Sequence, residues 1–203
     1  MNSKISFILI GVVGIFIGIL IAPIFSGNLM MGFTPGKKLA PTTSLGNIDR
    51  HFIEEMIPHH NGAIAMAELA LERSGREEIR SLSEDIIKAQ TLENNQMKEW
   101  YQAWFGGEVP ESFSGMSGMM HGQMPMHMEG MEGDIEALLR AENFDLEFLR
   151  QMILHHEMAI MMARMLSTGS VRSEMQILAD QIITSQSEEI EIMRNWQKEW
   201  SKK

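Results

Sequence analysis

The stretch DRHFIEEMIPHHNGAIAMA, residues 49–67, recurs as DLEFLRQMILHHEMAIMMA at residues 145–163. Shifting the chain against itself by 96 positions aligns residues 49–104 with residues 145–200 without a gap. About twenty of the paired positions are identical. Chance does not produce a match of that length, so the chain contains an internal duplication.

Each copy predicts a pair of helices. Apolar residues recur at spacings of three and four, and the strongest helix breakers lie near the middle of each copy, at Ser74-Gly75 and at Ser167-Thr168-Gly169. One helical hairpin cannot bury its apolar stripe alone, so two hairpins predict an all-α, antiparallel four-helix bundle. We expect the bundle at residues 47–203, with a first hairpin at residues 47–105 and a second at residues 134–203.

A Met-rich connector, residues 106–133, joins the two hairpins. Its centre, SGMSGMMHGQMPMHMEGMEG, shows neither helical nor strand periodicity and predicts a flexible loop. A plain low-complexity linker is the alternative, but linkers are normally built from small polar residues, and exposed methionine is prone to oxidation. The composition therefore favours capture of a soft metal ion. The candidate ligands are Met119, Met120, His121, Met124, Met126, His127 and Met128.

The N-terminus predicts export. No charged residue lies between Ile5 and Phe25, and Lys4 precedes this apolar run, which is long enough to cross a membrane. Residues 1–26 are expected to be a signal peptide or an uncleaved membrane anchor, with the folded part in the periplasm. Residues 27–46, rich in Gly, Pro, Ser and Thr, are expected to be a linker.

The composition limits the chemistry. The 203-residue chain has no cysteine, which excludes disulfides, thiolate zinc sites and cysteine nucleophiles. Any soft metal ligand must therefore be a thioether or an imidazole. The net charge is −10, which argues against nucleic acid as a partner and favours cations. A solvated acidic surface explains the charge equally well.

Each copy places thioether and imidazole groups on one helix face. Residues three and four apart share a face, so Met56 stacks over His59 and His60. Thioether suits Cu(I), and imidazole serves both Cu(I) and Cu(II), so the set favours copper. Core packing competes for any single methionine, because its flexible chain fills irregular gaps. The candidate ligands in the bundle are Met56, His59, His60, Met66, Met152, His155, His156, Met158 and Met162.

Adjacent histidines lie about 100° apart on a helix, so the two members of a pair cannot both face the bundle axis. One of each pair is expected to face inward and the other to lie on the flank of the bundle or at a helix interface. Gln90 and Gln186 are expected near the level of the histidines, where they could orient an imidazole by hydrogen bonding. The repeated tryptophans are expected to close the bundle ends. They are Trp100, Trp104, Trp196 and Trp200.

The motif Asp-x-x-Phe-x-x-x-Met-x-x-His-His-x-x-Ala-Ile-x-Met-Ala begins at Asp49 and again at Asp145. It resembles that of a widespread bacterial family of duplicated Met-x-x-His-His helical hairpins, first catalogued as a domain of unknown function. The resemblance covers about residues 47–200 and implies a ferritin-like bundle that binds copper through these Met and His residues. It also implies a periplasmic role in copper resistance. The preference for copper over another soft cation rests partly on this resemblance.

The sequence therefore predicts a periplasmic protein, and not an enzyme, that sequesters copper or hands it over, with Cu(I) preferred to Cu(II). Its expected partners are copper ions and a copper exporter or another envelope copper protein. Membrane contact is expected only through residues 1–26, if this segment is not cleaved. One alternative is a membrane-anchored interaction or scaffold protein without metal. Another is a di-iron enzyme, but such sites need Glu-x-x-His, and no Glu in this chain is followed by His three positions later.

Overall fold

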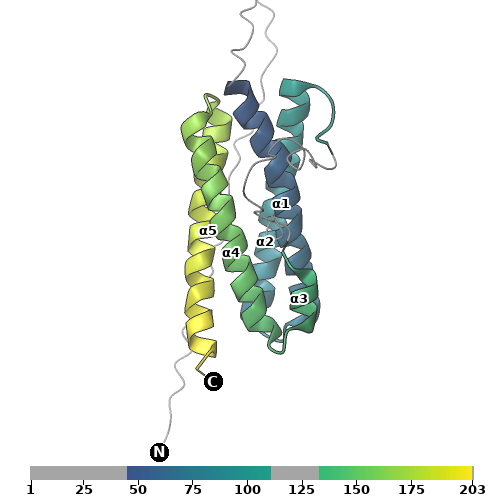
Figure 1. The fold of residues 1–203 in the computed structure, drawn as a ribbon, viewed down its shortest axis with the longest axis vertical. Coiled ribbons are helices and arrows are strands. Elements are labelled where there is room, and N and C mark those ends of the chain that lie inside the picture. The colour runs from purple at the N-terminus through teal and green to yellow at the C-terminus, as the bar shows by residue number, and fades with distance from the viewer. Residues whose placement is uncertain (1–44, 111–132, 203) are drawn as a thin grey trace, which may run out of the picture. The chain divides into compact units, whose positions relative to one another are not determined.

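Two helical hairpins make up the folded part of the chain. The computed structural model describes residues 45–110 and 133–202. Helices α1 (Leu45–Arg73) and α2 (Glu77–Phe105) form the first hairpin, and α4 (Phe144–Gly169) and α5 (Ser173–Trp200) form the second (Figure 1). The predicted all-α bundle is confirmed. The short helix α3 (Ile135–Arg140) was not predicted, because six residues are too few to show a helical period.

Local sequence signals set several helix ends. Asp134 and Asn143 cap α3 and α4, because each side chain accepts a hydrogen bond from the backbone N–H three residues later. Glu77 and Glu78 place negative charge at the N-terminus of α2, where the helix dipole favours it. Gly106 ends α2 with a φ of 73°, a conformation that suits glycine.

The second hairpin turn lies later than predicted. Helix α4 continues through Ser167-Thr168-Gly169, the predicted breaker, and the turn comes at residues 170–172. The Thr168 hydroxyl donates to carbonyls of the preceding helical turn, so this side chain has hydrogen-bond partners without interrupting the helix. A Cβ at Gly169 would lie 2.3 Å from Ile48 Cδ1. Gly169 therefore lets Ile48 of α1 pack closely against α4, and it does not end α4.

The two hairpins pack through α1 and α4. Asp49, near the start of α1, pairs with Arg172 after the end of α4, with 3.1 Å between Oδ2 and Nε. The equivalent pair, Asp145 and Arg76, joins the start of α4 to the end of α1 at 3.0 Å. The start of each helix thus lies beside the end of the other, so α1 and α4 run antiparallel. The 96-residue shift relates the two ion pairs, so the hairpins are related by an approximate two-fold axis.

The repeated tryptophans lie at these same contacts. They stack in two pairs with ring centroids 5.3 Å and 5.6 Å apart, Trp100 with Trp104 and Trp196 with Trp200. The guanidinium of Arg172 lies 4.2 Å from the ring centroid of Trp104, and that of Arg76 lies 4.0 Å from that of Trp200. Each arginine therefore combines an ion pair with a cation–π contact to the other hairpin.

The apolar core has two matching halves. One contains Phe52 and Met56 of α1 together with Ala163 of α4. The other contains the equivalent Phe148 and Met152 of α4 with residues from the second half of α1. In both helices the change from one half to the other occurs around the histidine pair. The two halves of the core therefore meet at the level of the histidines.

Within residues 45–110 and 133–202, no helix is both long enough and apolar enough to span a membrane. The predicted export segment, residues 1–26, and most of the predicted linker lie outside the described residues. So do the seven candidate ligands of the connector, which fall within residues 111–132.

Candidate metal centre

Four histidine side chains are buried in the bundle interior, near the middle of α1 and α4. His59, His60, His155 and His156 are each at most 2% exposed. The rings of His59 and His155 touch across the two hairpins, with centroids 3.7 Å apart and planes inclined by 41°. Because these two residues are equivalent in the duplication, their contact lies at the approximate two-fold axis.

The other histidine of each pair contacts the second helix of its own hairpin. His60 Nε2 lies 2.7 Å from Glu93 Oε2 on α2, and His156 Nε2 lies 2.6 Å from Glu189 Oε2 on α5. Adjacent residues on a helix point about 100° apart, so one ring reaches the other hairpin while its neighbour reaches the helix interface. This is the division of directions that the sequence predicted.

The carboxylates that bond the histidines were missed by sequence reasoning. Gln90 and Gln186 are buried, but their Oε1 atoms have no hydrogen-bond partner among the described residues. The bonds to the imidazoles come instead from Glu93 and Glu189, one helical turn further along. A signal was present in the sequence, because Glu93 and Glu189 are an identical pair in the duplication.

Three of the candidate thioethers lie close to the histidines along the chain. Met56 and Met152 are fully buried, one helical turn before the histidine pair of their helix. Met158 is partly buried, one turn after His155. These methionines are placed to approach the imidazole layer from its two sides.

Two other candidates lie further away. Met66 and Met162 follow the first histidine of their helix by seven residues, or about 10 Å along the axis. A Cβ at Gly133 would lie 2.4 Å from Met66 Sδ, so this sulfur packs against the backbone where the connector returns to the bundle. Met162 packs at the edge of one core half. The structure does not bring these two thioethers to the level of the imidazoles.

The interior keeps His59 uncharged. Burial lowers the pKa of His59 far below its ordinary value, because a charged ring loses its hydration there. The nearby His155, His60 and His156 lower this pKa further, because a protonated His59 would be repelled by any positive charge on them. Neutral imidazole is the form that binds metal ions.

We expect the metal-free protein to lose stability through His59 as the pH falls. The unfolded chain takes up a proton at the ordinary pKa of 6.5, whereas the folded chain resists protonation. The stabilisation is therefore complete above the unfolded pKa and declines below it, by at most about 1.4 kcal/mol per pH unit. Urea unfolding across this range measures the decline, and His59→Gln should make it shallower. If the stability of the unmodified chain and that of His59→Gln fell equally steeply with pH, His59 would not be neutral and buried in the folded chain.

Several buried polar atoms of the bundle interior have no hydrogen-bond partner among the described residues. They include both ring nitrogens of His59, Nδ1 of His60 and of His156, and Oε1 of Gln90 and of Gln186. Each buried atom of this kind costs about 1–3 kcal/mol when left unbonded. A cation bound among the acceptor lone pairs would offset this cost. The donor set, neutral imidazole beside thioether, fits a soft or borderline metal ion.

The described residues contain no group of three or more His, Asp or Glu side chains that could hold a metal ion. An ion in the histidine layer would therefore be bound with few ligands, or would add a thioether to the imidazoles. Two- or three-coordinate binding of that kind is uncommon for the divalent ions that need four or more donors.

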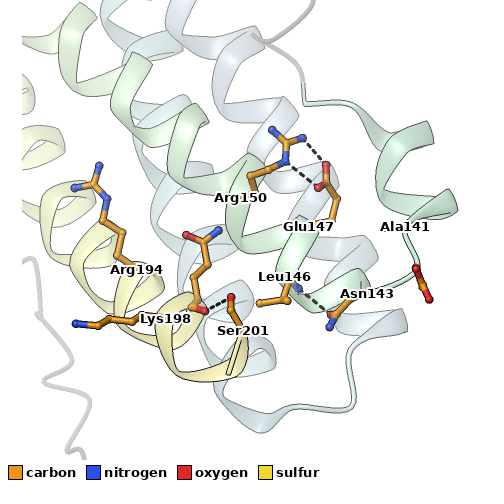
Figure 2. A pocket seen from close by; sticks show the side chains of 10 residues that line it. Ala141, Asn143, Leu146, Glu147, Arg150, Arg194, Lys198 and Ser201 are labelled. Carbon is orange, nitrogen blue, oxygen red and sulfur yellow. Dashed lines mark hydrogen bonds and ion pairs between the residues drawn. The ribbon is translucent and has the colours of Figure 1, made fainter. Parts of the chain in front are cut away.

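A surface pocket of about 590 Å³ lies elsewhere, between the start of α4 and the end of α5 (Figure 2). It includes Gln197 and Ser201, whose equivalents in the first hairpin are Tyr101 and Phe105. Those two rings pack edge to face, with centroids 5.2 Å apart. The pocket thus arises where the second copy lacks two aromatic rings. No His or Met lines it, so it is not part of the metal centre.

Comparison with known proteins places this architecture in a family. CopM in the Cu(II)-bound form is 47% identical, with a TM-score of 0.65, and the match covers 75% of this chain and 97% of that chain. CopM in the Ag-bound form is 45% identical, with a TM-score of 0.63 and coverage of 75% and 96%. CopM in the Cu(I)-bound form is 44% identical, with the same TM-score of 0.63 and coverage of 75% and 96%.

No curated protein matches the chain. Residues 49–197, which include both histidine pairs, match the family described as "Domain of unknown function (DUF305)". The match extends over more than half of the chain and over both hairpins. The chain therefore belongs to the DUF305 family and is CopM-like in sequence and fold.

Proposed function

We propose that this protein binds copper through the histidine layer of α1 and α4, and that it stores or hands over the ion without catalysis. The observation that carries the proposal is the contact of buried His59 with buried His155, two equivalent residues from the two copies. The unpartnered acceptor atoms around this contact support it. The similarity to CopM, which has structures in Cu(I)-, Cu(II)- and Ag-bound forms, supports copper as the ion.

Cu(I) is the oxidation state that suits the bundle interior best. It is soft, accepts thioether as well as imidazole, and is stable with few ligands. A divalent ion would bring more charge into a core that contains no group of three His, Asp or Glu ligands within the described residues. Buried Met56 and Met152 are the thioethers nearest along the chain to complete such a site. Zn(II) should bind weakly, because thioether is a poor ligand for zinc.

We place this activity in the periplasm, because residues 1–26 have the sequence of an export segment. The methionines and histidines of the connector would then form a second, adaptable set of copper ligands. Such a set could pass copper between the bundle and an exporter or another envelope copper protein. These roles contribute to copper tolerance.

Anaerobic titration with Cu(I) against a chromophoric chelator tests the proposal. The full chain should bind more than one equivalent, and deletion of residues 115–131 should lower this stoichiometry while a tight bundle site remains. Circular dichroism controls for the helical fold of the deletion variant. Failure of the full chain to take up copper would favour the metal-free scaffold. Purification of the protein with iron would favour a di-iron centre.

A further inference from the structure

The hydrogen bonds from His60 to Glu93 and from His156 to Glu189 are the same interaction made twice. We infer that Glu93 and Glu189 are positioning residues, which make His60 and His156 bind a soft monovalent cation through Nδ1. This inference rests on the proposed function and specifies the atoms that carry it out. It assigns to the two carboxylates a role in metal binding, in addition to joining the helices.

The hydrogen bond determines which ring nitrogen carries the hydrogen. A carboxylate accepts hydrogen bonds and has none to donate, so the Nε2 atoms that face Glu93 and Glu189 must be the donors. In a neutral imidazole the other nitrogen then has an open lone pair. A metal ion needs that lone pair, so Nδ1 is the ligating atom of His60 and of His156.

The surroundings of Nδ1 agree with this assignment. Both rings are completely buried, and Nδ1 of each has no hydrogen-bond partner among the described residues. Nδ1 and Nε2 lie on different edges of the ring, so the bond to the carboxylate directs the Nδ1 edge away from it. The carboxylates lie nearer to solvent, with side chains 12% exposed for Glu93 and 20% for Glu189. Each imidazole thus separates a partly solvated carboxylate from a buried lone pair.

A purely structural contact between the helices is the competing explanation. The neighbouring hydrogen bond, from Asn94 to Asn61 at 3.0 Å, provides a comparison. Its equivalent positions are occupied by Ile190 and Glu157, so the second hairpin cannot make it. The second hairpin has a different polar contact there, an ion pair between Glu157 and Arg194, whereas the His–Glu pair is the same in both copies.

The charge balance of the site also supports a role for Glu93 and Glu189 in metal binding. A monovalent cation in the bundle interior loses its hydration and needs compensating negative charge nearby. The two carboxylates supply that charge through the imidazoles, without binding the ion themselves. A carboxylate bonded to a ligating histidine also makes the ring a stronger donor, and its loss weakens metal affinity by about 10- to 100-fold in comparable sites.

Nuclear magnetic resonance of the full chain with ¹⁵N-labelled imidazoles tests the inference, with Ag⁺ as a diamagnetic monovalent probe. In the metal-free protein, Nε2 of His60 and His156 should be protonated and Nδ1 should not. Added Ag⁺ should then shift the Nδ1 resonances. In the double variant Glu93→Gln, Glu189→Gln, the free Ag⁺ concentration that half-shifts the Nδ1 resonances of His60 and His156 should rise about 10- to 100-fold, and the Nε2 resonances should change. These resonances report the bundle site apart from Ag⁺ held by the connector. The matched control Glu84→Gln, Glu188→Gln alters exposed carboxylates of the same two helices and should bind like the unmodified chain.

The outcomes of this experiment distinguish the role of the two carboxylates from the proposed metal binding by the bundle. Ag⁺ bound at Nε2, or bound with full affinity by the double variant, would overturn the role of the carboxylates and leave the proposed function standing. No Ag⁺ bound by the unmodified chain would overturn both. Glu93→Asp with Glu189→Asp, which keeps the charge but shortens the reach, should bind with intermediate affinity. Binding as weak as that of the Gln variant would show that the position of the carboxylate matters more than its charge.

Discussion

Replacing His59, His60, His155 and His156 together with Ala is expected to abolish tight Cu(I) binding by the bundle. These rings are the only imidazoles that the described structure buries, and the nearby thioethers alone hold Cu(I) weakly. The chain should remain helical, because the apolar core on either side of the histidine layer is unchanged. Competition titration with a Cu(I) chelator measures the affinity, and circular dichroism measures the helix content.

A chain lacking residues 115–131 is the right background for this comparison, because copper held by the connector would hide the loss. His51→Ala is the matched control, since His51 lies on α1 but is exposed, and this variant should keep its affinity. Leu at the same four positions removes the imidazoles without leaving cavities, so it serves if the Ala variant unfolds. Undiminished tight binding by either quadruple variant would exclude the histidines as ligands.

Arg172→Met should destabilise the bundle more than the equivalent Arg76→Met. Asp49, the partner of Arg172, has a side chain only 2% exposed, whereas Asp145, the partner of Arg76, is 21% exposed. Removing Arg172 therefore leaves a buried carboxylate without its counter-ion, a loss of about 3–5 kcal/mol in fully buried pairs. Both arginine side chains are 37% exposed, so solvent screening reduces the expected cost to about 2–3 kcal/mol. For Arg76→Met we expect about 1 kcal/mol.

Urea unfolding of the two variants, followed by tryptophan fluorescence, measures the difference. Each variant also loses one cation–π contact of similar geometry, so this contribution cancels in the comparison. Each arginine variant is therefore the control for the other, and the difference between them reports the burial of the paired aspartate. Equal losses of stability would show that the burial of Asp49 does not govern the strength of its ion pair.

Much of the fold could be predicted because the signals are local. Spacings of three and four give the helices, and the duplication requires the two hairpins to be equivalent. The turn at Ser74-Gly75 was placed correctly, whereas the one at Ser167-Thr168-Gly169 was not. There Thr168 bonds back within the helix and Gly169 accommodates Ile48, a contact between segments far apart in the sequence.

The candidate site, like the fold, could be predicted only in part from the sequence. The sequence determined that His59 and His60, and their copies, point in two directions, because residue spacing fixes the face of a helix on which a side chain lies. It did not determine the axial register between helices, where a shift of one turn, about 5.4 Å, exchanges Gln90 for Glu93 as the neighbour of an imidazole.

Only the tertiary structure brought His59 against His155 and left Met66 packed on Gly133. The antiparallel packing of α1 on α4, held at both ends by the arginine–aspartate pairs, sets the register between these two helices. The periodicity of apolar residues is a property of a single helix and can be seen in its sequence. Register is a property of two helices, and it depends on contacts between residues far apart in the chain, 33 positions for His60 and Glu93 and 96 for His59 and His155.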